Sequence, residues 1–350
     1  MAETLRSLSH ADYTVGWICA LPLELGAATA MLDEKHPTLP VQPNDENTYI
    51  LGRIGAHNVV IACLPYGMTG NNSAATVAND MARSFKSIKI RLMVGIGGGA
   101  PEEETDIRLG DVVVSKPTGI HGGVVQYDFG KTKQEGRFVR TGTLNKPPVE
   151  LLVAIGRLEA EHMSRDPKFS EYISAATAQH PKLASTFAYP GGEFDELFNA
   201  TYDHKPSEAT CENCDRRELV SRRTRHNTIP RIHYGNIASG NEVMRHGRTR
   251  DRWAREENVV CFEMEAAGLM DRFPCLVIRG ICDYADSHKN KRWQNYAAAT
   301  AAAYAKELLY TIPPGDSQVI SLPAESSEYY SNASSAVPMR GYGEYVFCYG

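Results

Sequence analysis

Short apolar runs alternate with amphipathic stretches in the first third of the chain, and this pattern predicts its secondary structure. Apolar runs typical of strands occupy residues 13–21, 48–65, 90–100 and 110–117, and the second contains a glycine turn that predicts two strands. Apolar positions spaced as on one helix face fill residues 23–36 and 73–85. Alternating strands and helices predict an α/β protein whose sheet has mixed pairing.

The same alternation returns at residue 232 and continues to residue 312. It predicts a strand at 232–240, a helix at 241–257, a strand, short helix and strand within 258–286, and a helix at 294–312. The last helix is rich in alanine, which has the highest intrinsic helix propensity. Two prolines and a glycine then end it.

The regions that flank and interrupt this pattern predict the domain organisation. Residues 131–231 are charged and rich in histidine and proline, with one amphipathic helix predicted at 148–163. We therefore predict a main domain at 13–312 with an insertion at about 131–231, preceded by an extension at 1–12. Residues 313–350 are rich in serine, tyrosine and glycine without periodicity, which predicts a flexible tail.

The composition is that of a globular protein with a substantial core. The 350 residues are 42% hydrophobic with a formal net charge of −5, which gives no electrostatic signature of a nucleic-acid or anionic-membrane partner. No apolar run approaches the roughly 20 residues of a membrane helix, and the N-terminus has no apolar signal core. Most of the eight cysteines lie in apolar strand-like runs, typical of reduced buried thiols, which predicts a cytoplasmic protein.

A glycine cluster at residues 94–100 formally matches the G-x-G-x-x-A dinucleotide fingerprint. That motif requires a helix directly after the glycines, whereas Pro101 and an acidic run follow here. The pattern therefore favours close approach of the backbone to a small ligand, or tight strand packing, over a dinucleotide site.

A second candidate is the CxxC pair formed by Cys211 and Cys214 in the predicted insertion. Together with His204 or His226 it could form a zinc knuckle. No second CxxC follows, so a solvent-facing hairpin with two free thiols remains an alternative.

Carboxylates close two predicted strands that follow one another in the sequence. Arg279 lies within the second strand, and Asp283 and Asp286 lie at its C-terminal end, while Glu263 and Glu265 close the first. Ligands of open α/β sheets bind beyond the carboxyl ends of the strands. An acid between apolar walls there can have a raised pKa and act as a general acid. Turn capping and a helix start are the structural alternatives, but the two sets together indicate a site.

The segments "FEMEAAG", "VIRGICDYAD" and "VGIGGGAP…LGDVVVS" resemble the purine nucleoside phosphorylase and nucleosidase superfamily. The pattern is similar to that of methylthioadenosine/adenosylhomocysteine nucleosidases and to that of fungal nucleoside-phosphorylase-like domains that head larger signalling proteins. The resemblance covers about residues 13–312, without much of the insertion. It implies a three-layer α/β/α fold with a mixed, partly barrel-like sheet, a catalytic domain without metal or organic cofactor, and a homo-oligomer.

The resemblance also implies roles for individual residues. Asp283 matches the aspartate that protonates the purine at N7, with Cys282 in place of the usual serine, and Arg279 matches the arginine of the same motif. Glu24 occupies the position that activates water, with Arg279 orienting the water or Glu24. Glu265 matches the glutamate that holds the ribose hydroxyls, whereas Glu263 is expected to be a supporting or packing residue. The full set expected to bind substrate is Glu265, Met264, Phe262, Glu242, Val243, Gly97 and Gly98.

The reaction class depends on what replaces the phosphate site of the related phosphorylases. Those enzymes have arginines after the first strand and before the glycine loop; here the corresponding positions carry "LPLEL" and Met93. Phosphate would meet the Glu24 carboxylate instead of guanidinium groups, which is repulsive. The sequence therefore favours a purine nucleoside N-ribohydrolase that releases base and ribose, with adenosine-type substrates. The alternatives are a phosphorylase and a non-catalytic module that senses nucleosides.

Overall fold

The computed structural model describes residues 8–205, 207–208 and 210–314, which all belong to one compact unit. The strands of its main sheet are β1 (Val15–Cys19), β2 (Glu34–Lys35), β3 (Tyr49–Ile54), β4 (His57–Cys63), β5 (Ile90–Gly99), β6 (Val112–Ser115), β7 (Val124–Gln126), β10 (Ile232–Ser239), β11 (Val259–Glu263) and β12 (Leu276–Asp283). A separate hairpin consists of β8 (Gly130–Thr132) and β9 (Phe138–Arg140).

The helices include seven α-helices and six short 3-10 helices within the described residues. The α-helices are α1 (Pro22–Ala30), α2 (Asn71–Ser84), α3 (Val149–His162), α4 (Phe169–Gln179), α5 (Leu183–Thr186), α6 (Gly247–Glu257) and α7 (Gln294–Thr311). The 3-10 helices are η1 (His10–Asp12), η2 (Gln134–Gly136), η3 (Gly192–Phe194), η4 (Cys211–Asn213), η5 (Arg216–Glu218) and η6 (Ala266–Gly268).

The main sheet is mixed and partly closed on itself. Its strand order is β11-β10-β6-β12-β5-β1-β4-β3-β2, with β7 beside β10. β5 pairs in parallel with β1 and β12, and it also pairs antiparallel with β11 through Cys261–Gly99 and Phe262–Gly98. This last pairing brings the strand at one end of the order back to the centre. It confirms the prediction of a mixed, partly barrel-like sheet.

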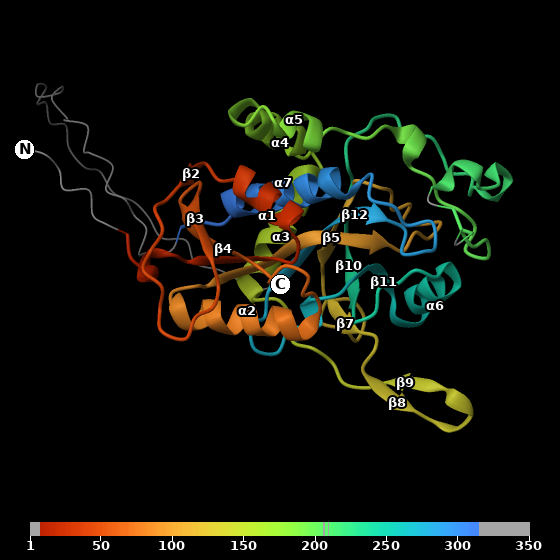
Figure 1. Ribbon diagram of the computed structural model, residues 1–350, viewed down its shortest axis with the longest axis horizontal. Helices are drawn as coiled ribbons and strands as arrows, with labels where there is room; N and C mark the ends of the chain where they lie inside the picture. Colours follow the sequence, from red (N-terminus) through yellow and green to blue (C-terminus); the bar gives the residue numbers. More distant parts are fainter. Residues whose placement is uncertain (1–7, 206, 209, 315–350) are drawn as a thin grey trace, which may run out of the picture. The chain divides into compact units, whose positions relative to one another are not determined.

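Alternate residues of the central strands face two helical layers, as the period of two in a strand requires. In β1, Val15, Trp17 and Cys19 pack with α1, α3, α4 and α7, whereas Ile18 packs with α2. Figure 1 shows α1 and α7 on one side of the central strands and α2 on the other. The predicted three-layer α/β/α architecture is therefore confirmed.

Two predicted helices have different bounds in the structure. The helix expected at 23–36 ends at Ala30 because the following residues form β2, where Glu34 pairs with Arg53. The helix expected at 241–257 begins at Gly247 because Asn241 is held by the Asp128 carboxylate and the residues after it line a pocket. In both places, tertiary contacts override local helix propensity.

The predicted insertion contains more structure than the one helix expected there. α3 lies at 149–162, close to the prediction, and its Leu151, Ile155 and Leu158 pack into the main core beside α7. The β8–β9 hairpin, α4 and α5 have no counterpart in the prediction. The domain bounds remain a prediction, and the tail expected at 313–350 lies outside the described residues from 315 onward. No helix in the described part of the chain has both the length and the apolar character needed to cross a membrane.

Candidate active site

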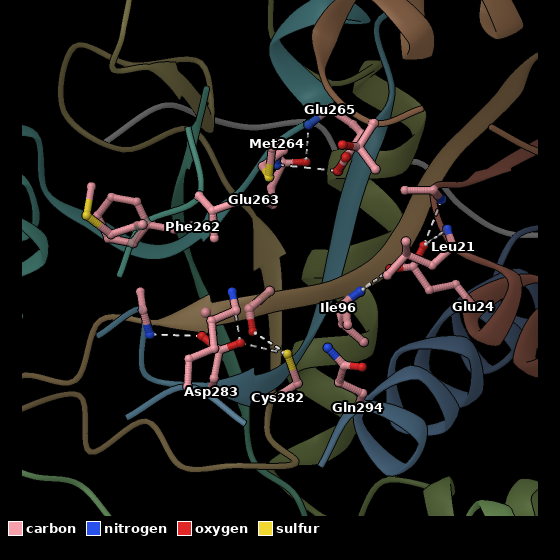
Figure 2. A pocket seen from close by; sticks show the side chains of 18 of the residues that line it. Leu21, Glu24, Ile96, Phe262, Glu263, Met264, Glu265, Cys282, Asp283 and Gln294 are labelled. Carbon is pink, nitrogen blue, oxygen red and sulfur yellow. Dashed lines mark hydrogen bonds and ion pairs between the residues drawn. The ribbon is translucent and has the colours of Figure 1, made fainter. Parts of the chain in front are cut away.

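A pocket of about 260 Å³ lies where β5, β11 and β12 meet the start of α1. Nine of the ten residues predicted for the site line this pocket, and Figure 2 shows several of them around it. The nine are Glu24, Gly97, Gly98, Glu242, Val243, Phe262, Met264, Glu265 and Asp283. The structure thus brings together residues that span 259 positions of the chain, while their individual roles remain predictions.

Glu24 lies in the first turn of α1 and is held in place by three backbone amides from outside that helix. Its Oε2 accepts from the N–H of Ala20 at 2.7 Å and of Leu21 at 3.0 Å, and its Oε1 accepts from Ile96 at 2.8 Å. Burial raises the pKa of Glu24, whereas the Arg279 charge and the three amides oppose this rise. Because a carboxylate has about four acceptor positions, one remains for a group in the pocket.

Arg279 lies behind the pocket wall, fully buried within β12, and is the one predicted residue that does not line the pocket. It forms an ion pair with Glu263, and its Nη2 lies 3.6 Å from Oε2 of Glu265. Its direct ion pairs are therefore with these two glutamates. The charge of Arg279 lowers the pKa of Glu24 from a distance. The structure therefore shows no direct contact by which Arg279 would orient Glu24, although the sequence led us to expect that role.

Glu263 supports the segment that carries Glu265. Besides the ion pair with Arg279, its Oε2 accepts from the N–H of Glu265 at 3.1 Å and of Ala266 at 3.0 Å. These amides open the 3-10 helix η6, whose first N–H groups have no partner within the helix. Glu263 thus fixes the backbone of the next acidic residue, which is the supporting position expected from the sequence.

Glu265 is a buried carboxylate with an unusually high pKa. Burial raises the pKa of Glu265 to about 7, with Glu263 and Glu24 adding to the rise and Arg279 opposing it. Its Oε1 accepts from Gly70 N–H at 3.4 Å and its Oε2 from Met264 N–H at 3.3 Å. Both contacts are long, so the carboxylate retains acceptor capacity toward the pocket.

Asp283 ends β12 with both of its oxygens in use. Oδ1 accepts from Ala285 N–H at 2.9 Å, and Oδ2 lies 3.1 Å from Nζ of Lys289. The Cys282 thiol also donates to Oδ2 at 3.1 Å, so a hydrogen bond exists where the related motif has serine. Burial alone would lower the pKa of Lys289, but the Asp283 charge outweighs it and the pKa is raised. The pair is thus an ammonium and a carboxylate in contact.

The glycines of β5 make room for this arrangement. A side-chain carbon at Gly95 would lie 2.6 Å from the carboxyl carbon of Glu24 and 2.5 Å from Nη1 of Arg279. One at Gly98 would lie 2.7 Å from Oδ1 of Asp283. The glycine cluster therefore permits close packing and close approach, as the sequence favoured. A loop, not a helix, follows β5, so the context of a dinucleotide fingerprint is missing there.

Sequence reasoning missed several residues of the pocket wall. Lys289 is the most important, since it is the charged partner of Asp283, and the basic cluster "HKNKR" after the aspartates was the available signal. Other wall residues outside the predicted substrate-binding and catalytic set are Ala20, Leu21, Thr69, Ile96, Met244, Glu263, Cys282, Ala285 and Gln294. Asp286 does not line the pocket, and its carboxylate lies near Arg250, at 3.5 Å.

Comparison with known proteins agrees with this fold. A 5′-methylthioadenosine/S-adenosylhomocysteine nucleosidase structure from Helicobacter pylori superposes with a TM-score of 0.53 at 15% identity, covering 86% of this chain and 99% of that one. The family model described as the phosphorylase superfamily matches residues 14–310. The chain belongs to this superfamily.

Three relatives show where such domains occur. A nucleotide-binding leucine-rich repeat (NLR)-like protein of Hyaloscypha variabilis is 50% identical over 309 residues, which are 88% of this chain and 30% of that protein. A 5′-methylthioadenosine/S-adenosylhomocysteine nucleosidase of Mycobacterium bovis is 25% identical over 86% of this chain and 97% of its own length. The ATP nucleosidase Cap17 of Escherichia coli is 25% identical over 83% of this chain and 50% of its own length. These relatives support the prediction of an N-glycosyl hydrolase.

Proposed function

We propose that the chain is a purine nucleoside N-ribohydrolase that releases a free base and ribose, with adenine-type substrates preferred. The observation that carries this proposal is Glu24, a buried carboxylate fixed by three backbone amides with one acceptor position open to the pocket. An anion held in this way can accept a proton from water. Glu265 and Asp283 line the same pocket and supply the remaining groups that cleavage of an N-glycosidic bond requires.

Asp283 and Lys289 act on the leaving group, which is the purine base. Protonation of the purine at N7 makes the base a better leaving group, and a positioned acid contributes to such a step. Because Lys289 Nζ lies 3.1 Å from Oδ2 of Asp283, the ammonium is a proton source in contact with the carboxylate. In the proposed step the proton passes from Lys289 through Asp283 to N7, and the electrons of the C1′–N9 bond leave with the base.

Glu265 and Glu24 act on the sugar and on the attacking water. Glycosidic cleavage passes through a transition state with positive charge on the sugar. Glu265, when ionised, accepts hydrogen bonds from both ribose hydroxyls and places negative charge near that cation, an interaction that strengthens as the charge develops. Glu24 takes a proton from the water that attacks C1′. Its amide contacts hold the carboxylate in place before the reaction begins.

Hydrolysis is favoured over phosphorolysis by the charges around the pocket. Among the described lining residues, the one cation is Lys289, which is paired with Asp283, while Arg279 is paired with Glu263 and Glu265 behind the wall. A phosphate at the water position would therefore lie beside the Glu24 carboxylate without a guanidinium partner. Two anions in contact at low dielectric repel each other strongly.

The base preference is supported by the relatives and by the donors and acceptors near Asp283. The names of the M. bovis and E. coli relatives specify adenine-containing substrates, but these differ in the group at C5′. A carboxylate oxygen can accept from the 6-amino group of adenine while the acid donates to N7. We leave the 5′ group to experiment.

A nucleoside panel tests the proposal directly. Adenosine, methylthioadenosine, adenosylhomocysteine, ATP, inosine and guanosine are incubated with the full chain, with and without phosphate, and products are separated by chromatography. Free adenine together with the unphosphorylated C1 sugar, independent of phosphate, is the expected result. A 1-phosphorylated sugar formed only with phosphate would establish the phosphorylase alternative. Binding of a nucleoside without turnover of any substrate would favour the sensing module.

Assembly and location belong to the same proposal. We propose a homo-oligomer in the cytoplasm that takes a nucleoside and water as its reactants. Static light scattering of the full chain, together with cell fractionation, tests both points.

A further inference from the structure

A second cluster of chemically active side chains lies outside the pocket, where His204 and residues 211–214 meet the loop after β12. It contains His204, Cys211, Cys214 and His288. Nδ1 of His204 lies 3.3 Å from Sγ of Cys214 and 3.9 Å from Sγ of Cys211. Ligand atoms of His204, Cys214 and His288 all lie within 4.8 Å of one another. The two cysteines are the CxxC pair, and His226, the other candidate partner in the sequence, is exposed and outside this group.

His204 is held in the tautomer that a metal ligand needs. Its Nε2 lies 2.9 Å from the carbonyl oxygen of Glu208, so Nε2 carries the proton and donates it. The lone pair is therefore on Nδ1, which faces the two sulfur atoms. A ring nitrogen that donates to a backbone carbonyl while the other faces the ion is the usual arrangement of metal-binding histidines.

His288 is an independent observation that points to a metal ligand. The residue is 6% exposed, and neither ring nitrogen has a hydrogen-bond partner among the described residues. The carboxylate of Asp286 is 3.8 Å from Nδ1, too far for a hydrogen bond. Stacking on Phe198 and Tyr202, with ring centroids 4.1 and 5.4 Å away, fixes the plane of the imidazole. Burying such a group without a partner is destabilising, and coordination of a metal ion would remove that cost.

We propose that His204, Cys211, Cys214 and His288 bind one zinc ion in a structural Cys₂His₂ site. Tetrahedral zinc with bonds of about 2.3 Å to sulfur and about 2.1 Å to nitrogen requires nitrogen–sulfur separations of about 3.6 Å. The two separations measured at His204, 3.3 and 3.9 Å, lie on either side of this value. Four protein ligands leave no open coordination position, so the role is structural.

The site would connect the predicted insertion to the segment that follows Asp283. Ser287 already bridges the two parts, since its Oγ accepts from His204 N–H at 2.9 Å and lies 3.2 Å from Oδ1 of Asp203. His288 directly precedes Lys289, whose ammonium contacts Asp283. A metal that fixes His288 therefore fixes the backbone from which Lys289 reaches the pocket. Zinc binding does not depend on the proposed function, whereas this effect on catalysis does.

Metal analysis of the full chain tests the site. The protein is purified without chelator and its metals are measured by inductively coupled plasma mass spectrometry. We expect about one zinc per chain in the wild type, and a loss of more than tenfold in the double variant Cys211→Ser/Cys214→Ser. His226→Gln and Cys63→Ser are the matched controls, and both should retain the ion.

A change of ligand type distinguishes coordination from a general loss of folding. His288→Cys keeps a ligand and should retain zinc, whereas His288→Gln should lose most of it. Cobalt in the wild type should show thiolate charge-transfer bands that are absent from the serine double variant. Zinc absent from the wild type after reconstitution with one equivalent, a Cys211–Cys214 disulfide in anaerobically purified protein, or equal zinc in the serine variant would each overturn the proposal.

The effect on catalysis is a separate readout. Removal of zinc by chelator should lower kcat on the best substrate by about tenfold, within the range typical of positioning residues around a site, and zinc should restore it. A zinc-containing protein with no activity on any nucleoside would refute the proposed function and leave the metal site intact. Unchanged kcat after verified zinc loss would refute the link to Lys289.

Discussion

Replacement of Asp283 by asparagine is the sharpest test of the proposed chemistry. The carboxylate accepts from Ala285 N–H through Oδ1 and from the Lys289 ammonium through Oδ2. Asparagine has the same shape but offers one acceptor oxygen and one donor NH₂ group. One of the two contacts must then place donor against donor. The variant keeps the volume of the site while it removes both the acid and the counter-ion of Lys289.

The expected loss follows from these contacts. A positioned general acid contributes about 10²- to 10⁴-fold in rate, or roughly 3 to 5.5 kcal/mol in activation free energy. We expect kcat of Asp283→Asn to fall about 10³-fold, with KM changed less because Glu265 still holds the sugar. One unsatisfied buried contact should lower the free energy of unfolding by about 1–3 kcal/mol.

A double-mutant cycle with Lys289→Met tests the proton path. If the proton on N7 comes from Lys289 through Asp283, the two residues act as a unit, and the double variant should be no slower than Asp283→Asn alone. Lys289→Met alone should lose about 10²-fold in kcat. Single-turnover kinetics measure these rates, and denaturant unfolding measures stability separately.

Two controls separate chemistry from folding. Asp271→Asn changes an exposed aspartate between β11 and β12 and should leave kcat and stability unchanged. Thermal unfolding and nucleoside binding should show that Asp283→Asn is folded. Turnover of this variant within tenfold of wild type would refute the assignment of Asp283 as the acid. Fully additive losses in the cycle would refute the path through Lys289.

Three further predictions concern the carboxylates of Glu24 and Glu265 and the glycine at position 95. Glu24→Gln should lower kcat about 10²- to 10⁴-fold with little change in KM, because it removes the base; unchanged steady-state kcat would contradict its role. Glu265 must be ionised to accept hydrogen bonds from two hydroxyl groups, and its pKa is about 7. We therefore expect kcat/KM to rise with pH through about 7. A flat profile across this range, in buffers of constant ionic strength, would show that Glu265 need not be ionised. Gly95→Ala places a carbon 2.5 Å from Nη1 of Arg279. We therefore expect the free energy of unfolding to fall by about 1–3 kcal/mol, together with activity. An unchanged free energy of unfolding would show that the neighbouring strands can move apart to accommodate the methyl group.

Local sequence patterns were sufficient to predict most of the main elements. The alternating apolar runs predicted β1, β3, β4, β5, β6, β10, β11 and β12 close to their observed bounds, because a strand buried by helices needs apolar residues on both faces. The alanine-rich α7 was predicted for the same local reason, namely its intrinsic propensity. Short or exposed elements such as β7 and the β8–β9 hairpin were missed, since they have too few buried positions to leave a pattern.

The site was predicted in part through its residue types. Carboxylates at strand ends and a glycine cluster are conspicuous in an apolar sequence, and they pointed to Glu265, Asp283, Gly97 and Gly98. The other five lining residues named in advance came from the resemblance to the superfamily. Arg279 was assigned to Glu24 or water, but its direct partners are Glu263 and Glu265. Lys289 was missed because the basic cluster that contains it does not single out one lysine as the partner of Asp283. Its significance depends on the 3.1 Å contact with Asp283.

The sequence by itself thus determined the class of fold, the acidic residues at the strand ends and the glycine cluster, whereas the position of a phosphate site came from the resemblance to the superfamily. These features depend on residue identity and on spacing within one element. The tertiary structure decided which charges pair, that Glu263 supports the backbone of Glu265 while both line the pocket, and that His204 and His288 lie beside the CxxC cysteines. Such pairings join residues up to 84 positions apart at the cluster. They arise from the packing of whole strands and loops, and no local pattern encodes them.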